Sequence, residues 1–395
     1  MRPRPGIARS SLYFVVLLGL VSLLADATYE GARSVSGPYL ALLGAGAAAV
    51  GFVAGLGEMA GYALRLLSGL IADRTRRYWA IAIGGYLVNL AAVPLLALAG
   101  SWRVAALLIV AERAGKAMRT PARDAMLSHA AANLGRGWAF GLHEALDQLG
   151  AVAGPALVAW TLSAHGSYRR AFLLLGIPAA LAIATLAMAR ALWPHPRELE
   201  GKSPPPATDG LPPLFWLAVG GAALWAAGYA DFALIAYHLQ GEQLFDGPSI
   251  AILYAAAMGW DGLAALWLGR LYDRIGLRLI SFVALAAAPC ALLVFTGNKA
   301  ASLAGLALWA TGMGAQESVL RAAVAELAPG ERRASAYGIF HAAYGVSWFA
   351  GSALMGLLYG VSCGALAGFS VSMLLGAAWL FGLASRRHQR SGNQP

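Results

Sequence analysis

The chain has 395 residues, of which 59% are hydrophobic and only 12% are charged. A soluble protein of this length carries about a quarter charged residues and divides into two or three domains, so this composition excludes a soluble enzyme and a secreted protein. The net charge of +10 would suggest nucleic-acid binding in a soluble protein, but here the basic residues are spread over short loops between apolar blocks. That distribution indicates membrane topology and predicts no nucleic-acid partner.

The apolar residues fall in repeated blocks of about 20 to 28 residues, each long enough to cross a hydrocarbon core about 30 Å thick as a helix. Cuts at clusters of charged residues, proline and glycine give twelve predicted helices, at 11–42, 46–72, 77–99, 103–130, 136–163, 168–191, 213–240, 247–272, 278–297, 301–327, 334–359 and 363–385. The connection at 193–212 is long, polar and proline-rich. We therefore predict an all-α polytopic membrane protein with an N-terminal six-helix bundle at 1–192, a cytoplasmic linker at 193–212 and a C-terminal six-helix bundle at 213–395.

Lysine and arginine predict the orientation. With the N-terminus inside, most loop cations, beginning with Arg2, Arg4 and Arg9, lie on the cytoplasmic side. This asymmetry predicts that both termini are cytoplasmic. The Ala- and Gly-rich composition suggests a bacterial inner membrane. Helices 3, 6, 9 and 12 of the series carry no ionisable residue inside their apolar spans, so we expect them to face lipid while the others line an interior cavity.

The two halves repeat each other. Gly69-Leu-Ile-Ala-Asp73-Arg74-Thr-Arg-Arg77 follows the second helix of the first half. It returns 200 positions later, in the corresponding loop of the second half, with Gly269, Asp273, Arg274 and Arg278. A six-helix unit that occurs twice is typical of transporters that rock one half against the other.

These two loops resemble the signature of the major facilitator superfamily, Gly-x-x-x-Asp-Arg-x-Gly-Arg-Arg, and the topology and duplication extend the resemblance over essentially the whole chain. The first copy departs from the signature, because Arg76 stands where glycine is usual. The resemblance implies a secondary transporter with twelve transmembrane helices in two pseudo-symmetric bundles, working by alternating access. It also implies that the loop residues form a conformational latch: Gly69, Asp73, Arg74, Arg77, Gly269, Asp273, Arg274 and Arg278.

The fifth predicted helix contains Gly141, Gly150, Gly154 and Pro155 at spacings that resemble the antiporter motif of the drug/proton branch of the same family. Val158 and Ala159 replace the last two glycines of that motif. From the residues alone, the glycines predict close helix contact and the proline permits a bend. Ordinary glycine-rich packing in an Ala- and Gly-rich protein is the alternative.

Charged residues are unusually dense in the first half. In the fourth helix Glu112, Lys116, Arg119 and Arg123 are spaced four, three and four apart, which keeps them on one face. Two interpretations stay open for these groups: buried ion pairs that hold helices together, or carboxylates that exchange a proton as the cavity alternates. We assign proton coupling to Asp26, Glu30, Glu144 and Asp147, with His143 as a relay. The predicted substrate cavity takes residues from both halves: Arg33, Glu58, Glu112, Arg113, Lys116, Arg119, Arg123, Tyr229, Asp231, Glu317, Arg321 and His341.

No ATP-binding Gly-x-x-x-x-Gly-Lys motif occurs, so the proton gradient is the expected energy source and no cofactor is expected. The leading hypothesis is proton-coupled export of a small amphipathic compound by a monomeric antiporter in the lipid bilayer. The alternative is a proton-coupled transporter of a specific anionic or polar metabolite, favoured by the basic stripe of the fourth helix. Metal-ion export is a third possibility, but no ligand spacing supports a metal site. An enzyme or a sensor is not expected, since no catalytic motif or soluble domain is found.

Overall fold

The computed structural model describes residues 5–131, 136–194, 211–327 and 333–392, and these are almost entirely helical. Every predicted helix coincides with a helical segment. The first half contains α1 (Pro5–Arg33), α2 (Ser36–Leu42), α3 (Ala47–Thr75), α4 (Tyr78–Leu95), α5 (Trp102–Ala131), α6 (Arg136–His165) and α7 (Tyr168–Leu192). The second contains α8 (Pro213–Gly228), α9 (Phe232–Gly241), α10 (Gly247–Ile275), α11 (Arg278–Ala287), α12 (Cys290–Val294), α13 (Lys299–Ala315), α14 (Arg321–Leu327), α15 (Arg333–Val361) and α16 (Cys363–Gly392).

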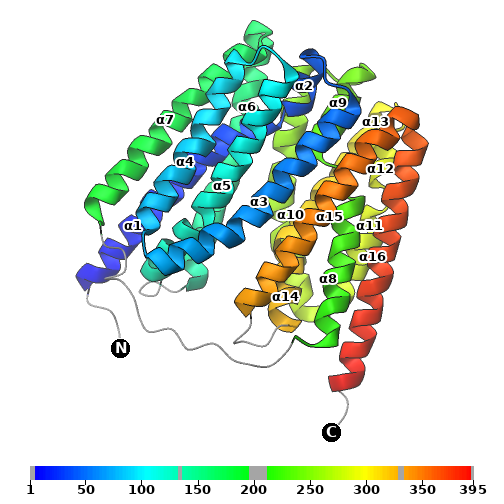
Figure 1. The fold of residues 1–395 in the computed structure, drawn as a ribbon. Helices are drawn as coiled ribbons and strands as arrows, with labels where there is room; N and C mark the ends of the chain where they lie inside the picture. Colours follow the sequence, from blue (N-terminus) through cyan, green and yellow to red (C-terminus); the bar gives the residue numbers. More distant parts are fainter. Residues whose placement is uncertain (1–4, 132–135, 195–210, 328–332, 393–395) are drawn as a thin grey trace. The chain divides into compact units, whose positions relative to one another are not determined.

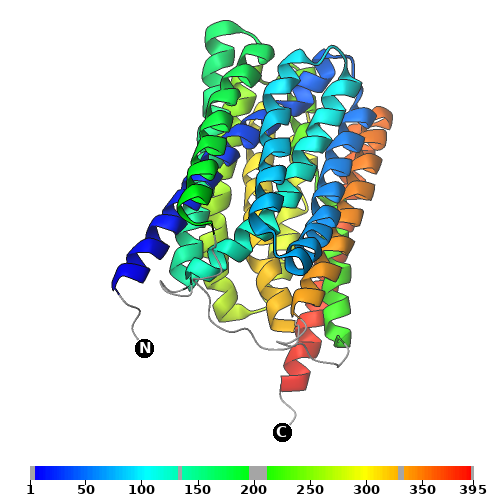
Figure 2. The same ribbon diagram turned by 60° about the vertical axis from the view of Figure 1, so that its left-hand side comes forward.

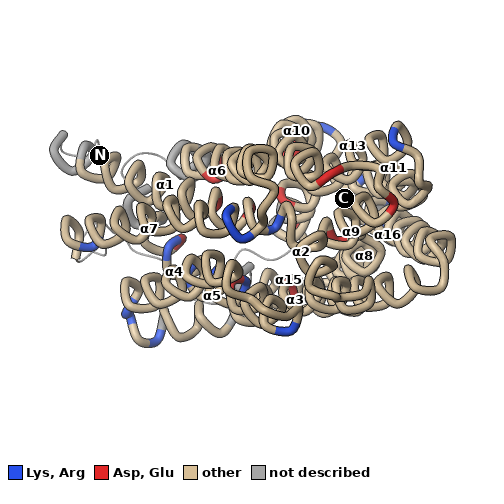
Figure 3. The backbone as a smooth tube through the Cα atoms, turned by 90° about the horizontal axis from the view of Figure 1, so that it is seen from above, with Lys and Arg blue, Asp and Glu red and all other residues tan. Residues whose placement is uncertain are grey.

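Eight helices of the described part of the chain are long and apolar enough to cross a membrane. Figure 3 shows the same sparseness of charge, because most of the described backbone carries neither acidic nor basic residues. The predicted first helix, at 11–42, is divided into α1 and α2, the seventh into α8 and α9, and the ninth into α11 and α12. The tenth is divided into α13 and α14, with a π-helical turn at Gln316–Leu320 between them. The charged stripe of the fourth helix lies on α5, a continuous helix of 30 residues.

Two compact units are distinguished by their internal contacts. The described residues within Met1–Tyr39, Ala63–Pro204 and Gly247–Ala255 form unit 1, and those within Leu40–Tyr62, Pro205–Asp246 and Ala256–Pro395 form unit 2. Each unit therefore includes one segment from the opposite half of the sequence. The division into six-helix halves at the 193–212 linker stays a prediction.

In unit 1, α1 packs against α6 and α7, and α4 packs against α5 and α7 (Figures 1 and 2). In unit 2, α8 packs against α15 and α16, and α11 packs against α16. A core cluster in unit 1 joins side chains of α1, α4, α5 and α7, including Phe14, Tyr86 and Leu127. The apolar faces of these four helices meet in this cluster, as expected for helices that bury one side.

The internal repeat is visible as one helix contact that occurs twice. In unit 1, a methyl group added to Gly154 of α6 would lie 2.0 Å from the carbonyl oxygen of Ala27 in α1. In unit 2, a methyl group added to Gly351 of α15 would lie 2.0 Å from the carbonyl oxygen of Ala227 in α8. Only glycine permits two helix backbones to approach this closely. The contact matches position 27 with position 227, so Tyr29 corresponds to Tyr229 and Gly31 corresponds to Asp231.

The signature loops after α3 and α10 also repeat a backbone conformation. Arg76 has φ 59° and Gly276 has φ 61°, and each amide donates to a carbonyl four residues earlier, in Ala72 and Tyr272. A left-handed residue ends many helices in this way, and glycine adopts it at little cost. The first copy therefore keeps the conformation of the signature although it lacks the glycine.

Candidate functional site

Close packing of α1 on α6 brings two carboxylates of unit 1 together. A methyl group added to Gly150 would lie 2.2 Å from the carbonyl oxygen of Leu23 and 3.0 Å from Cβ of Asp26. Asp26 lies on the face of α1 that this glycine contacts, and Asp147 lies one turn before Gly150 on α6. The antiporter-like glycines therefore form the packing face predicted from their spacing, and the same face carries the acidic residues.

Asp26 is buried and is contacted by two groups. The hydroxyl of Tyr29 donates to its Oδ2 at 2.8 Å, and Nη2 of Arg119 lies 3.6 Å from its Oδ1. Arg119 is only 1% exposed, and its guanidinium lies 4.3 Å from the centre of the Tyr86 ring. Its Nε and Nη1 find no hydrogen-bond partner among the described residues. A buried arginine with unused N–H groups can bind a further anion without new desolvation.

Asp147 is held more loosely than Asp26. Its Oδ2 lies 3.6 Å from Nη1 of Arg123 and 3.7 Å from Nε2 of His143. Both distances exceed the 2.7–2.9 Å of a charge-assisted hydrogen bond. Its buried Oδ1 has no hydrogen-bond partner in the part of the chain that the structure describes. This carboxyl group has the lone pairs that a transferred proton needs.

Arg123 is shared among several groups. Its Nη1 donates to the hydroxyl of Ser22 at 2.9 Å, and its Nη2 lies 2.8 Å from Oδ1 of Asp124. His143 lies 3.2 Å from the same hydroxyl of Ser22 through Nε2. Arg123 is thus paired with Asp124 in preference to Asp147, since the former distance is 0.8 Å shorter than the 3.6 Å latter one.

Glu30 forms the second centre of the site. Nη1 of Arg33 and Nζ of Lys116 each lie 3.8 Å from its Oε1. The hydroxyl of Tyr254, on α10, donates to its Oε2 at 2.5 Å. The short contact to Glu30 thus comes from a tyrosine hydroxyl, while its contacts with Arg33 and Lys116 at 3.8 Å are longer than a hydrogen bond.

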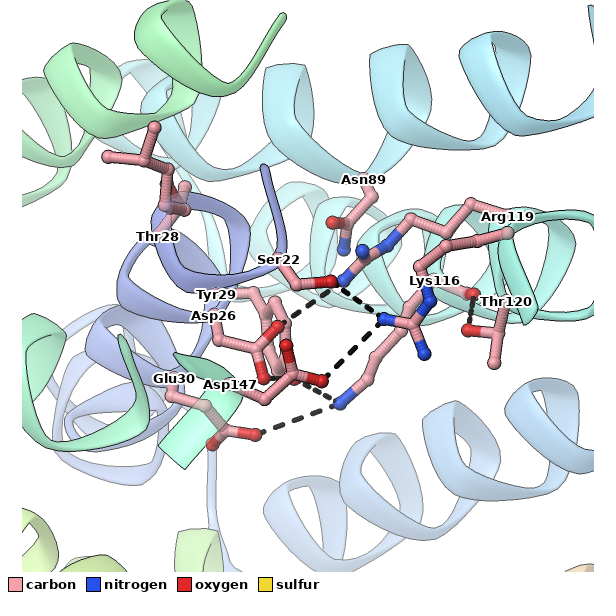
Figure 4. Close-up of polar contacts among 12 residues, drawn as sticks. Ser22, Asp26, Thr28, Tyr29, Glu30, Asn89, Lys116, Arg119, Thr120 and Asp147 are labelled. Atoms are coloured by element: carbon pink, nitrogen blue, oxygen red, sulfur yellow. Dashed lines mark hydrogen bonds and ion pairs between the residues drawn. The ribbon is translucent and has the colours of Figure 1, made fainter. Parts of the chain in front are cut away.

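Tyr29 connects the two centres (Figure 4). Its hydroxyl donates to Asp26 and accepts a hydrogen bond from Nζ of Lys116. Lys116 also lies 3.8 Å from the centre of the Tyr29 ring, and the guanidinium groups of Arg113 and Arg119 lie 6.0 and 5.8 Å from it. Three cations thus lie within 6.0 Å of the centre of one buried aromatic ring, where its quadrupole attracts them.

Glu112 completes the group from α5. Arg113 Nε lies 3.5 Å from its Oε2, and Nδ2 of Asn89, on α4, donates to both its Oε1 at 2.8 Å and its carbonyl oxygen at 3.0 Å. Gly115 permits this contact, because a methyl group there would lie 2.3 Å from the backbone nitrogen of Asn89. The stripe predicted on the fourth helix is therefore brought together with the acids of α1 and α6.

Other predicted site residues lie elsewhere. Glu144 is exposed on α6, so it does not join the buried carboxylates of α1 and α6. Glu58 lies in the part of α3 that groups with unit 2. Gly141, Asp73 and Arg321 fall among the residues whose side chains are not described, and their roles stay predictions.

In unit 2, Asp231 caps α9 by accepting a hydrogen bond from the amide of Ala233 at 3.0 Å. Tyr229 donates to the carbonyl oxygen of Trp309, and both residues are buried. His341 stacks between the rings of Tyr62 and Tyr337, at 5.4 and 6.1 Å. Glu317 lies in the π-helical turn. In unit 2 the predicted site residues therefore take part in helix capping and aromatic packing, whereas those of unit 1 form a cluster of charged groups.

The predicted latch residues lie at the ends of α3 and α10. Arg74, Arg77, Asp273, Arg274 and Arg278 are exposed, as expected for charges at a membrane surface. A methyl group added to Gly69 would lie 3.6 Å from Cβ of Pro121 in α5, an ordinary contact. The latching role itself stays a prediction.

Sequence reasoning missed Tyr29, Tyr254, Ser22 and Asn89. Tyr29 had one usable signal, since it follows Asp26 by three residues and precedes Glu30 on the same helix. The other three are revealed only by packing between helices. Among the described residues, no three His, Cys, Asp or Glu side chains are grouped so as to hold a metal ion.

Comparisons with known proteins agree on the family. The family model described as Major Facilitator Superfamily matches residues 14–352. Uncharacterised proteins of Mycobacterium bovis and Mycobacterium tuberculosis are 43% identical over 370 residues, which is 92% of this chain and 90% of theirs. An uncharacterised transporter of the same superfamily type from Methanocaldococcus jannaschii is 35% identical over 144 residues, 36% of each chain.

Two kinds of solved structure share the fold. A bacterial homologue of the human lysosomal transporter Spinster, in an inward-facing and unoccupied conformation, superposes with a TM-score of 0.71 at 16% identity, covering 97% of this chain and 98% of that chain. The nucleoside transporter NupG superposes with a TM-score of 0.74 at 16% identity, covering 93% of this chain and all of that chain. At this identity the likeness concerns the fold alone.

Proposed function

Because the chain belongs to the major facilitator superfamily and is an integral membrane transporter, we propose that it is a proton-coupled secondary transporter whose proton is carried by Asp147 together with Asp26. The observation that carries the proposal is the buried Oδ1 of Asp147, which has no hydrogen-bond partner among the described residues. A structural ion pair would use both oxygens of a buried carboxylate. A proton carrier must instead be able to gain and lose its proton as the cavity alternates.

We propose a small anionic or polar metabolite as the substrate. Five bases gather on α1 and α5 of unit 1, close to the acidic residues of α1 and α6: Arg33, Arg113, Lys116, Arg119 and Arg123. Cations in a low-dielectric cavity favour anionic cargo. Large aromatic side chains that could contact an amphipathic compound, such as Trp225 and Tyr229, are buried in the core of unit 2.

Export of an amphipathic compound in exchange for protons is the second candidate. It is favoured by the close α1–α6 contact at Gly150 and Gly154, which agrees with the spacing of the antiporter-like motif. We further propose that the protein works as a monomer in a bacterial inner membrane with both termini in the cytoplasm, as the distribution of cations indicates.

The test uses the full chain reconstituted in liposomes that contain a trapped pH-sensitive dye. Inorganic phosphate, citrate, benzoate and ethidium are added outside in turn, and the change of internal pH is recorded. Asp147→Asn should reduce the proton movement that accompanies transport by at least about tenfold, because amide nitrogen cannot carry the proton. Glu242→Gln, which changes an exposed carboxylate beyond α9, should not alter it.

Glu144→Gln is a useful comparison within α6. The sequence makes Glu144 a coupling candidate, whereas its exposure in the structure predicts transport at the wild-type level. Wild-type proton movement in both Asp147→Asn and Asp26→Asn would overturn the proposal. Loss of folding in either variant is recognised by its thermal unfolding, and Asp147→Glu then supplies a variant that keeps the carboxylate.

A further inference from the structure

Glu30 lies near two cationic side chains and accepts a hydrogen bond from a tyrosine. Arg33 and Lys116 both approach its Oε1 at 3.8 Å, and Tyr254 supplies the 2.5 Å hydrogen bond to the other oxygen. The guanidinium of Arg113 lies 6.0 Å from the centre of the Tyr29 ring. Lys116 is therefore close enough to Glu30 to stabilise its negative charge, but its 3.8 Å contact is longer than the 2.7–2.9 Å of a charge-assisted hydrogen bond.

A second observation points to a ligand at this place. Arg119 is 1% exposed, yet its Nε and Nη1 have no hydrogen-bond partner among the described residues. Charged N–H groups that are buried without a hydrogen-bond partner are unfavourable in a protein interior. An anionic group seated between Arg119 and Lys116 would satisfy them.

We propose that an anionic group of the substrate binds these bases in place of the carboxylate of Glu30, and that Tyr29 couples this exchange to Asp26, so that substrate and proton cross the membrane together in the same direction. This inference rests on the proposed function, since it takes Asp26 and Asp147 as the proton carriers. It adds the chemical class that the site recognises, the mode of coupling and a positioning residue, Tyr29.

Charge balance requires the proton to accompany the anion. In the structure the buried acids and bases of unit 1 nearly neutralise one another, as the pairs of Asp26 with Arg119 and of Glu30 with Lys116 illustrate. Adding an anion leaves one carboxylate without a cation, and an uncompensated buried charge is strongly unfavourable. Uptake of a proton from water by Asp26 restores neutrality. Release of the anion on the other side returns the cations to the carboxylates, and Asp26 loses its proton there.

An antiporter needs the opposite arrangement. A cationic substrate and a proton compete for one carboxylate, so they cannot both be bound and must move in opposite directions. Here substrate and carboxylate compete for the cations, which makes binding of substrate and binding of the proton mutually supportive. The sign of the substrate's charge therefore determines the coupling: a cationic substrate predicts antiport with protons, and an anionic substrate predicts symport.

Tyr29 is placed to transmit the exchange. Its hydroxyl holds Asp26 as acceptor and Lys116 as donor at the same time. When Lys116 turns toward a bound anion, the hydroxyl loses its donor and Asp26 loses part of its stabilisation as an anion. Both changes favour a proton on Asp26 while substrate is bound.

The first experiment measures binding by the full chain in detergent, with inorganic phosphate, citrate and benzoate as separate probes and thermal unfolding as readout. At least one probe should raise the unfolding temperature of the wild type and of Lys116→Arg, which keeps the charge. The same probe should bind Lys116→Gln at least about tenfold more weakly, since a charge-assisted contact is lost. Absence of a shift with all three probes in folded protein would overturn the anionic assignment.

The second experiment uses liposomes that contain the trapped pH dye and the probe that bound. Entry of the anion should acidify the interior, whereas alkalinisation would demonstrate antiport and overturn the inference. Tyr29→Phe keeps the ring that faces the cations and removes the hydroxyl. The variant should exchange labelled probe across the membrane at a rate within about twofold of the wild type. Its accumulation of probe driven by a pH gradient should fall by about tenfold, the effect of losing one hydrogen bond to a charged group.

Tyr86→Phe is the matched control, because its ring also faces Arg119 but its hydroxyl has no hydrogen-bond partner among the described residues. It should accumulate the probe like the wild type. Equal accumulation by Tyr29→Phe and Tyr86→Phe would overturn the role of Tyr29. If ethidium movement alkalinises the interior and Asp147→Asn abolishes this, the proposed proton coupling stands while the present inference fails, so the two failures are distinguishable.

Discussion

Replacing Gly154 by alanine tests whether the glycine-rich face of α6 is required for helix packing. A methyl group there would lie 2.0 Å from the carbonyl oxygen of Ala27 and 2.7 Å from its carbonyl carbon. Real Cβ atoms essentially never approach closer than 3.0 Å, so α1 and α6 must separate locally by about 1 Å. Because a carbonyl oxygen of a helix cannot move aside as a flexible side chain can, the strain falls on the backbones.

The expected magnitude follows from two opposing contributions. Overpacking of a well-packed interior costs about 1–3 kcal/mol, and the rigid backbone partner places this site near the upper end. Alanine regains about 1 kcal/mol over glycine through its greater helix propensity. We therefore expect Gly154→Ala to reduce the free energy of unfolding by about 2 kcal/mol.

Thermal unfolding of the purified protein in detergent, followed by tryptophan fluorescence, measures the effect. Gly351→Ala should lose a similar amount, because its methyl group would lie 2.0 Å from the carbonyl oxygen of Ala227 in the equivalent contact of unit 2. Gly84→Ala in α4 is the control, since no atom lies within 4 Å of its added methyl group. Unfolding temperatures of Gly154→Ala and Gly84→Ala that coincide would refute the packing argument.

Three further substitutions test other parts of unit 1 and unit 2. Gly276→Ala should lower the free energy of unfolding by about 1 kcal/mol, because it places a Cβ on a residue with φ 61°. Arg76→Ala should change stability little, because Arg76 already carries a Cβ at φ 59°. Equal effects of the two variants in thermal unfolding would contradict the strain argument. Asn89→Ala should lower the free energy of unfolding by about 1–3 kcal/mol, because it removes both hydrogen bonds that the Asn89 amide donates to Glu112. An unchanged unfolding temperature would show that water replaces these hydrogen bonds.

The sequence by itself determined the class of protein and most of its elements. Each of the twelve predicted spans coincides with helix because blocks of apolar residues have only one way to satisfy their backbone in lipid. The signature loops at Gly69 and Gly269, together with the topology and the duplication of the halves, were sufficient to indicate the family. The spacing of Glu112, Lys116, Arg119 and Arg123 also placed these side chains on one face, since helical periodicity depends on local geometry alone.

Only the tertiary structure decided which charges meet. Periodicity gives the face of a helix but not its rotation about its axis or its depth against a neighbour, and these are set by contacts such as Gly150 with Leu23. That packing joins Asp147 to the site and leaves Glu144 exposed, although the two lie three residues apart. It also brings in Tyr254 from a segment 224 positions after Glu30, a proximity that no local pattern encodes.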